Sequence, residues 1–233
     1  MKVIEMKLHK DTKKNFFTLA DNLVLEIIYG KCQNSILITL YKLMITLKIG
    51  VAFHRLGFYY LTGELNGISI YGCLTSGWVP NYNLALRYLK RAYALGIKES
   101  AHDIASTYFQ EVFEYTVKRN VEAPKKLLRE MLKWIKLALP YEHGDRRARM
   151  YHYQAWNEFH YGDKSKAIFL WKKAARNGGA YAMLELGIVY GWGEGVAKNL
   201  KVATRYFHKC VACDSTLIDV VRISMRELGL KMG

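Results

Sequence analysis

Between residues 182 and 214, apolar residues recur every three or four positions among polar ones. This helical period predicts two helices joined by a turn. Small and large apolar residues recur three or four positions apart within each helix: Ala182, Leu186 and Tyr190 in the first, and Ala203 and Tyr206 in the second. Residues three or four apart lie on the same side of a helix, so each helix has one apolar face. Because a lone helical pair cannot bury both faces, the pattern predicts further copies.

The same offsets recur along the chain. In order of decreasing clarity, the other copies occupy residues 163–178, residues 52–60 with 81–96, residues 101–109 with 127–138, and residues 34–50. The connection in the copy at 101–138 is irregular, and the copy at 34–50 has bulky residues where the better copies have alanine. The chain is therefore predicted to be a helical repeat protein.

The best copy has a motif that can be read residue by residue. It runs Ala182-x-x-x-Leu186-Gly187-x-x-Tyr190-x-x-Gly193-x-Gly195-Val196, and a second motif starts at Asp163-x-x-Lys166-Ala167. These motifs resemble the Sel-one-like repeat family, which is related to the tetratricopeptide repeats. The resemblance covers residues 50–214 well and residues 20–50 poorly. It implies an all-α fold, a right-handed α-solenoid of about five helix-turn-helix repeats with a terminal capping helix.

The repeat interpretation predicts one solenoid domain over residues 1–233. A degenerate helical pair is expected at 15–50, the repeats at 51–214 and the capping helix at 215–233. Each unit of a solenoid contacts only its neighbours, so no internal boundary is required. The three prolines, Pro80, Pro124 and Pro140, all fall between or after predicted helices.

Several notable residues have a packing role in this interpretation. Glycines and alanines are expected where the two helices of a pair cross closely. Gly193 and Gly195 suit a turn with unusual backbone angles, and Asn199 suits the N-cap of the helix that follows. Gly191-x-Gly193-x-Gly195 also lacks the lysine-hydroxyl ending of a nucleotide-binding loop, so no phosphate site is predicted there.

Candidate catalytic and metal-binding residues are sparse. His152 and His160 lie on one predicted helix near Glu158 and Asp163, but the other histidines are scattered with no matching spacing. The Cys210-x-x-Cys213 motif has no second pair, and Cys210 occupies a small-residue position of the repeat. We therefore predict a non-enzymatic protein without a cofactor, a metal or an evident small-molecule ligand. A hydrolase related to the cysteine-rich, β-lactamase-like members of the resembled family is a less favoured alternative.

The cysteines and the N-terminus indicate a compartment. Cys32, Cys73, Cys210 and Cys213 do not form one pair per repeat, which argues against a disulfide-stapled exported solenoid. No compact apolar stretch with a small-residue cleavage site follows the first lysines. Residues 36–61 are apolar, but Lys42, Lys48, His54 and Arg55 interrupt them, so no membrane-spanning helix is predicted. The expected location is the cytoplasm.

The net charge of +15 favours an acidic partner. Positive side chains recur every three or four residues on one predicted helical face, which we call the basic strip: Lys125, Arg129, Lys133 and Lys136. Arg146 and Arg147 follow nearby. The strip is either a solvated outer face or a docking site for an acidic protein. Nucleic acid is a second candidate partner, but most tyrosines that would stack on bases are already assigned to repeat packing.

An insertion separates the two helices of the copy at 52–96. Residues 64–78 are rich in glycine, poor in charge and include Tyr71 and Trp78. Insertions in repeat arrays often fall on a binding face, so Tyr71 and Trp78 are candidate partner-binding residues. The alternative is a loop that folds back over the N-terminal helices.

The sequence thus predicts a protein–protein interaction adaptor or scaffold that binds an acidic protein on its concave face. In the resembled family, intracellular bacterial members include scaffolds, effectors and immunity proteins, and we favour a bacterial immunity or effector type. The alternative is a basic solenoid that binds nucleic acid.

Overall fold

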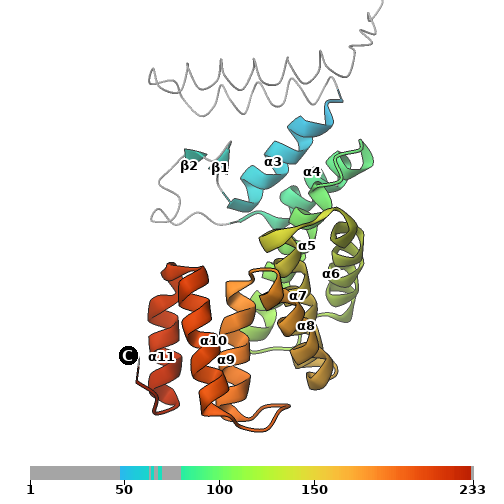
Figure 1. Cartoon of the computed structure of the whole chain (residues 1–233). Helices are drawn as coiled ribbons and strands as arrows, with labels where there is room; N and C mark the ends of the chain where they lie inside the picture. Colours follow the sequence, from blue (N-terminus) through green and yellow to red (C-terminus); the bar gives the residue numbers. More distant parts are fainter. Residues whose placement is uncertain (1–47, 63, 66–67, 70–79, 232–233) are drawn as a thin grey trace, which may run out of the picture. The chain divides into compact units, whose positions relative to one another are not determined.

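The computed structural model describes residues 48–62, 64–65, 68–69 and 80–231 (Figure 1). The chain divides into two compact units, Met1–Ile97 and Lys98–Gly233. Apart from the last one, the described helices form antiparallel pairs of the α-solenoid type, as the repeat pattern predicts. The prediction of one continuous domain stays a prediction, and most of the faint copy at residues 34–50 lies outside the described residues.

The first unit contains a helical pair interrupted by a hairpin. Helix α3 (Gly50–Thr62) packs against α4 (Tyr82–Ala94). Two short antiparallel strands, β1 (Glu64–Leu65) and β2 (Ile68–Ser69), lie between them, with Glu64 opposite Ser69. The strands were not expected, and they place a hairpin at the start of the predicted insertion.

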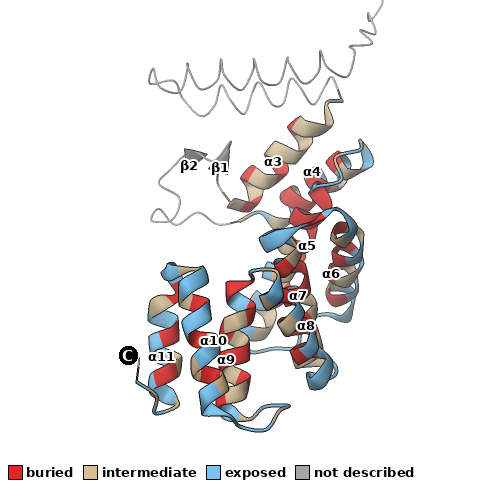
Figure 2. Cartoon of the chain, in the orientation of Figure 1, coloured by how far each residue is buried: buried red, intermediate tan, exposed pale blue. Residues whose placement is uncertain are grey.

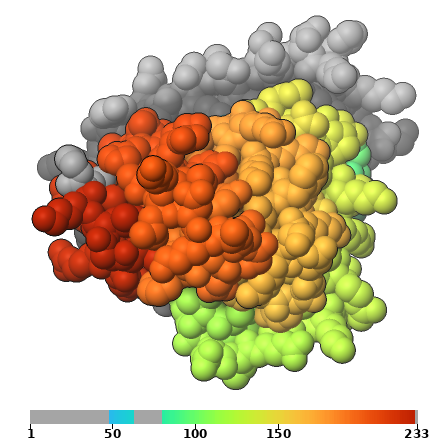
Figure 3. Space-filling view, turned by 60° about the horizontal axis from the view of Figure 1, so that its bottom comes forward, coloured from blue at the N-terminus to red at the C-terminus, as the bar shows by residue number. Residues whose placement is uncertain are grey.

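The second unit contains three helical pairs and a final helix. Figure 3 shows its segments following one another in chain order across one face, from yellow-green through orange to red. The helices are α5 (Ser100–Phe113), α6 (Lys125–Ala138), α7 (Gly144–Tyr161), α8 (Lys164–Arg176), α9 (Ala180–Trp192), α10 (Leu200–Cys213) and α11 (Ile218–Glu227). A π-helical turn follows α5 at Glu114–Lys118, and 3-10 turns lie at Leu139–Tyr141 and Ser215–Leu217.

The second helix of each well-marked repeat begins with the same cap. The side chains of Asn81, Asp163 and Asn199 accept hydrogen bonds from backbone amides in the first turns of α4, α8 and α10. Such caps satisfy amide groups that the helix leaves without an internal partner. The N-cap predicted for Asn199 is confirmed. Asp163 and Asn81 occupy the equivalent position in their repeats and have the same capping role.

Close helix crossing also repeats. A Cβ atom added to Gly57 would lie 2.6 Å from Leu89, and one added to Gly187 would lie 2.5 Å from Phe207. Leu89 and Phe207 stand eight residues after their caps, as does Trp171, and all three are buried. Gly193 and Gly195 have positive φ values of 81° and 71°, as predicted for the turn before α10.

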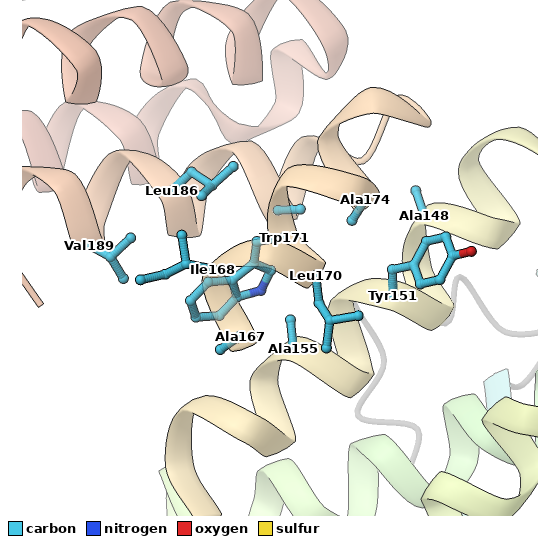
Figure 4. Close-up of a cluster of buried hydrophobic side chains, with 11 residues drawn as sticks. Ala148, Tyr151, Ala155, Ala167, Ile168, Leu170, Trp171, Ala174, Leu186 and Val189 are labelled. Carbon is cyan, nitrogen blue, oxygen red and sulfur yellow. The ribbon is translucent and has the colours of Figure 1, made fainter. Parts of the chain in front are cut away.

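The core of the second unit continues from one pair to the next. Figure 4 shows Trp171 and Ile168 of α8 among side chains of α7 and α9, including Ala155, Leu186 and Val189. A second cluster joins α9, α10 and α11, so α11 covers the last repeat. The helix predicted after the last repeat is present as α11. None of the described helices is long and apolar enough to cross a membrane.

The buried face of α6 begins one residue after the start of the predicted repeat segment at 127–138. Its buried residues are Leu128, Met131, Trp134, Ile135 and Ala138. Successive steps along Leu128, Met131, Ile135 and Ala138 are three, four and three residues long, so these side chains lie on one helical face. Leu127 lies beside that face and is only partly buried.

Candidate functional site

A pocket of about 500 Å³ opens on the second unit, on the side formed by the first helix of each pair. Its walls come from α5, α7 and α9, and its edge includes the turn after α8 and the end of α10. Because it draws on three successive pairs, the pocket exists only when the repeats stack. A volume of this size is typical of ligand and side-chain binding sites.

Aromatic rings form much of the pocket wall. Phe109 and Tyr153 stack with ring centroids 4.0 Å apart, which ties α5 to α7. Tyr153 also donates a 3.5 Å hydrogen bond to Ser106 Oγ. Tyr181 of α9 is 55% exposed, and its ring centroid lies 6.1 Å from that of His152. A large exposed ring beside a hollow is the kind of surface that contacts a partner.

His152 brings an unused polar atom to the wall. Its side chain is buried, and its Nδ1 atom has no hydrogen-bond partner within the described part of the chain. Burial lowers the pKa of His152 from 6.5 to about 4, so the ring is neutral at physiological pH. This nitrogen is enclosed by protein atoms, so His152 leaves a buried polar atom uncompensated beside the pocket.

The pocket edge is polar and partly neutralised. Arg149 donates two hydrogen bonds to Asp145 Oδ2, at 2.6 Å and 3.1 Å. Asp214 accepts hydrogen bonds from the backbone and hydroxyl of Thr216. The exposed thiol of Cys213 donates a 3.0 Å hydrogen bond to the carbonyl of Gly178. One arginine and two aspartates leave this edge slightly negative within a strongly basic chain.

The candidate catalytic residues have structural partners. Glu158 forms an ion pair with Lys166 at 2.5 Å, and Asp163 caps α8. His160 is exposed, whereas His152 is buried. Neighbouring protein atoms still shield part of the His160 ring from water, and this partial desolvation, together with the charge of Lys164, lowers the pKa of His160. No group of three or more metal-binding side chains gathers in the portion of the chain that the structure describes.

The two cysteines of the Cys-x-x-Cys motif differ. Cys210 is buried at the position that Ala92 and Ala174 occupy in the other repeats, and burial raises the pKa of its thiol to about 11. Cys213 is exposed. The packing interpretation of Cys210 agrees with the structure, while Cys213 borders the pocket. Cys32 and Cys73 lie outside the described residues.

The four residues of the basic strip are exposed along one side of α6 (Figure 2). Lys133 lies 3.7 Å from Glu130 and also above the ring of Trp134. Helix α6 contributes no residue to the pocket, so the strip and the pocket are separate surfaces. Tyr71 and Trp78, the candidate residues of the insertion, lie outside the described residues.

Arg146 has a partner that the sequence did not reveal. It donates two hydrogen bonds, of 2.6 Å and 3.0 Å, to the buried carboxylate of Glu142. The bond to Glu142 raises the pKa of Arg146. His102 Nδ1 lies 3.6 Å from Glu142 Oε1, and burial followed by the charge of Arg146 lowers the pKa of His102. This buried group joins α5 to the start of α7.

Three segments of the chain match the Sel1 repeat: residues 71–97, 141–179 and 180–210. These segments contain α4 and the pairs α7–α8 and α9–α10. The chain is a Sel1 repeat protein. Proteins with Sel1 repeats generally act as non-catalytic scaffolds for protein–protein interaction. The α5–α6 pair falls outside the matched segments, in line with its weaker sequence pattern.

Two solved structures are similar to this Sel1 repeat protein. One is a Sel1 repeat protein from Oxalobacter formigenes, with 19% identity and a TM-score of 0.45 over 72% of this chain and 60% of that one. The other is a protective antigen of uropathogenic Escherichia coli strains that displays an SLR fold. It has 19% identity and a TM-score of 0.51, over 84% of this chain and 38% of that one. No curated protein sequence matches the chain.

Sequence reasoning missed the pocket of this Sel1 repeat protein. Phe109, Tyr153 and Tyr181 lie on first helices, which the repeat pattern predicts, but their convergence depends on how successive pairs stack. A signal was present: Tyr153 and Tyr181 are large aromatic residues at positions that the repeat motif leaves open. The free Nδ1 of His152 could be identified only from the structure.

Proposed function

We propose that this Sel1 repeat protein is a non-catalytic adaptor that binds a protein partner on the face formed by α5, α7 and α9. The observation that carries the proposal is the pocket shared by three successive pairs, with the exposed ring of Tyr181 in its wall. A partner segment that fills the pocket buries the aromatic surface of its wall.

The partner is an acidic protein. The chain has a net charge of +15, and the strip on α6 presents four exposed cations of which Lys133 has an ion pair. Such a surface attracts an acidic protein and orients it before close contact. The pocket then supplies shape and apolar contact, so the two separate surfaces have different roles in one interaction.

An immunity-type or effector-type protein fits this description. Either would act by covering a surface of its partner, which requires a stable binding face and no chemistry of its own. A basic solenoid that binds nucleic acid is the competing function, and the net charge alone supports it. The slightly negative edge of the pocket, with Asp145 and Asp214, repels phosphate groups, so it favours a protein segment over nucleic acid at the pocket.

Affinity capture from the native cell tests the proposal. The strip variant changes Lys125, Arg129, Lys133 and Lys136 to glutamate. A matched control makes the same change at the exposed residues Lys201, Arg205, Lys209 and Arg226. We expect the wild type and the control to retain one acidic protein, and the strip variant to lose it at low salt. Capture of nucleic acid instead, or equal capture by both variants, would contradict the acidic-partner proposal.

A further inference from the structure

Three arginines lie close together near the start of α7, and their partners differ. Arg146 is bonded to Glu142, and Arg149 is bonded to Asp145. Arg147 has no carboxylate within ion-pair distance among the residues that the structure describes. The local sequence therefore supplies a carboxylate for two of the three positive charges and leaves the third without one.

Arg147 shares a tyrosine with a second cation. Its guanidinium carbon lies 6.0 Å from the ring centroid of Tyr151, and Lys173 Nζ of α8 lies 4.4 Å from the same centroid. Burial would raise the pKa of Tyr151, but the neighbouring positive groups of Lys173 and Arg147 lower it below its usual value. Figure 4 shows the Tyr151 hydroxyl pointing away from the apolar cluster. We call Arg147 and Lys173 the clamp pair.

Arg147 occupies an unfavourable position within the isolated protein. Its Nε atom is buried without a hydrogen-bond partner in the described part of the chain. A buried donor that loses water and gains no acceptor lowers stability, more so when it is charged. Arg147 also lies near the N-terminus of α7, where the helix dipole disfavours a positive charge. Local choices that conflict with stability in this way concentrate at functional sites.

We propose that the clamp pair is the docking point for a carboxylate side chain of the acidic partner, an inference that rests on the proposed function. The two oxygens of a carboxylate can accept hydrogen bonds from a guanidinium and an ammonium together. Lys173 is exposed and Arg147 is half-buried, so solvent reaches Lys173 and part of the Arg147 side chain other than its buried Nε atom.

The pocket explains why the carboxylate would dock beside it. Ala148 and His152, each one residue further along α7 than Arg147 and Tyr151, line the pocket. Asp145 and Asp214 at the pocket edge repel a carboxylate. A partner segment with an apolar residue in the pocket would therefore direct a neighbouring acidic residue to the clamp pair.

A defined acidic peptide tests the inference with the full chain. The probe is fluorescein-labelled decaglutamate, and binding is followed by fluorescence anisotropy at low salt. The variant R147Q/K173Q removes the clamp pair. The control R205Q/K209Q removes the same two residue types from exposed positions of α10. We expect affinity to fall about tenfold in the clamp variant and less than twofold in the control. Equal losses in both variants would overturn the proposal.

Two further readouts separate docking from a structural role and from nucleic-acid binding. The single variant R147Q should unfold at the same temperature as the wild type or higher, because it removes a charged side chain whose buried Nε atom has no hydrogen-bond partner. A clear fall in unfolding temperature with unchanged peptide affinity would assign Arg147 a structural role instead. A single-stranded RNA oligonucleotide should bind the clamp variant and the control alike, and selective loss in the clamp variant would contradict a carboxylate site.

The outcomes also distinguish this inference from the proposed function. Decaglutamate that still binds R147Q/K173Q with wild-type affinity, while the acidic partner is still captured from the cell, would remove the clamp pair and leave the adaptor function standing. A wild-type protein that neither binds decaglutamate nor captures an acidic protein would remove both.

Discussion

Single residues in this protein divide into those that the repeat requires and those that it leaves free. Gly187, Asn199 and Cys210 take positions that recur in other copies, and each could be assigned to packing or capping from the sequence. His152 and Arg147 have no such recurring role, and both have a buried nitrogen without a partner in the described residues. Because the repeat gives His152 and Arg147 no role, these two residues are candidates for a function.

His152 makes stability depend on pH. Burial lowers the pKa of His152 from its ordinary value of 6.5, which applies to the unfolded chain, to about 4 in the folded protein. The unfolded chain therefore takes up a proton at a higher pH than the folded one. The contribution to stability is complete above about pH 6.5 and is lost as the pH falls towards 4. By linkage it amounts to roughly 3 kcal/mol.

The variant H152Q checks this dependence by urea unfolding at pH 7 and at pH 4.5. The difference in stability between the two pH values should be smaller in H152Q than in the wild type. His102 contributes a slope of the same sign, because its pKa is also lowered, so the comparison between proteins is the readout. H208Q, which removes an exposed histidine, is the control. An unchanged pH dependence in H152Q would contradict the burial argument.

At the scale of the elements, most of the helical pairs could be predicted because burial fixes them. The residues eight positions after each cap, Leu89, Trp171 and Phe207, are buried against the first helix of their pair, and their spacing is visible in the sequence. The exact stripe of α6 could not be predicted, because Leu127 and Leu128 are both leucine and differ only in helical phase. The hairpin after α3 lies within an insertion that the repeat does not describe.

The close crossing of α9 and α10 predicts a strong effect at Gly187. Alanine is favoured over glycine by about 1 kcal/mol in a helix, so propensity alone predicts stabilisation. A Cβ atom at Gly187 would instead lie 2.5 Å from the ring of Phe207. We expect G187A to lower the free energy of unfolding by about 1–3 kcal/mol, measured by chemical denaturation.

The exposed substitution K201A on α10 is the control for G187A, and its effect should stay within about 0.5 kcal/mol. A G187A protein as stable as the wild type would mean that α9 and α10 can move apart at little cost. The crossing would then not limit which residues the repeat accepts.

At the scale of the whole molecule, the family and the all-α fold could be predicted and the pocket could not. Periodicity describes contacts between neighbouring helices, whereas the pocket joins residues from Phe109 to Asp214 across three pairs. Net charge indicates the kind of partner but not where it sits, because the strip on α6 and the pocket are separate surfaces. Three-dimensional stacking supplies the binding face that the sequence leaves open.

The central claim is that the partner binds at the pocket on α5, α7 and α9, and a block at Cys213 tests it most directly. In a background with Cys32 and Cys73 changed to serine, a bulky maleimide should label exposed Cys213 and spare buried Cys210. We predict that the labelled protein no longer captures the acidic partner, whereas the same background carrying C213S retains it after identical treatment. Full capture by the labelled protein would contradict the account.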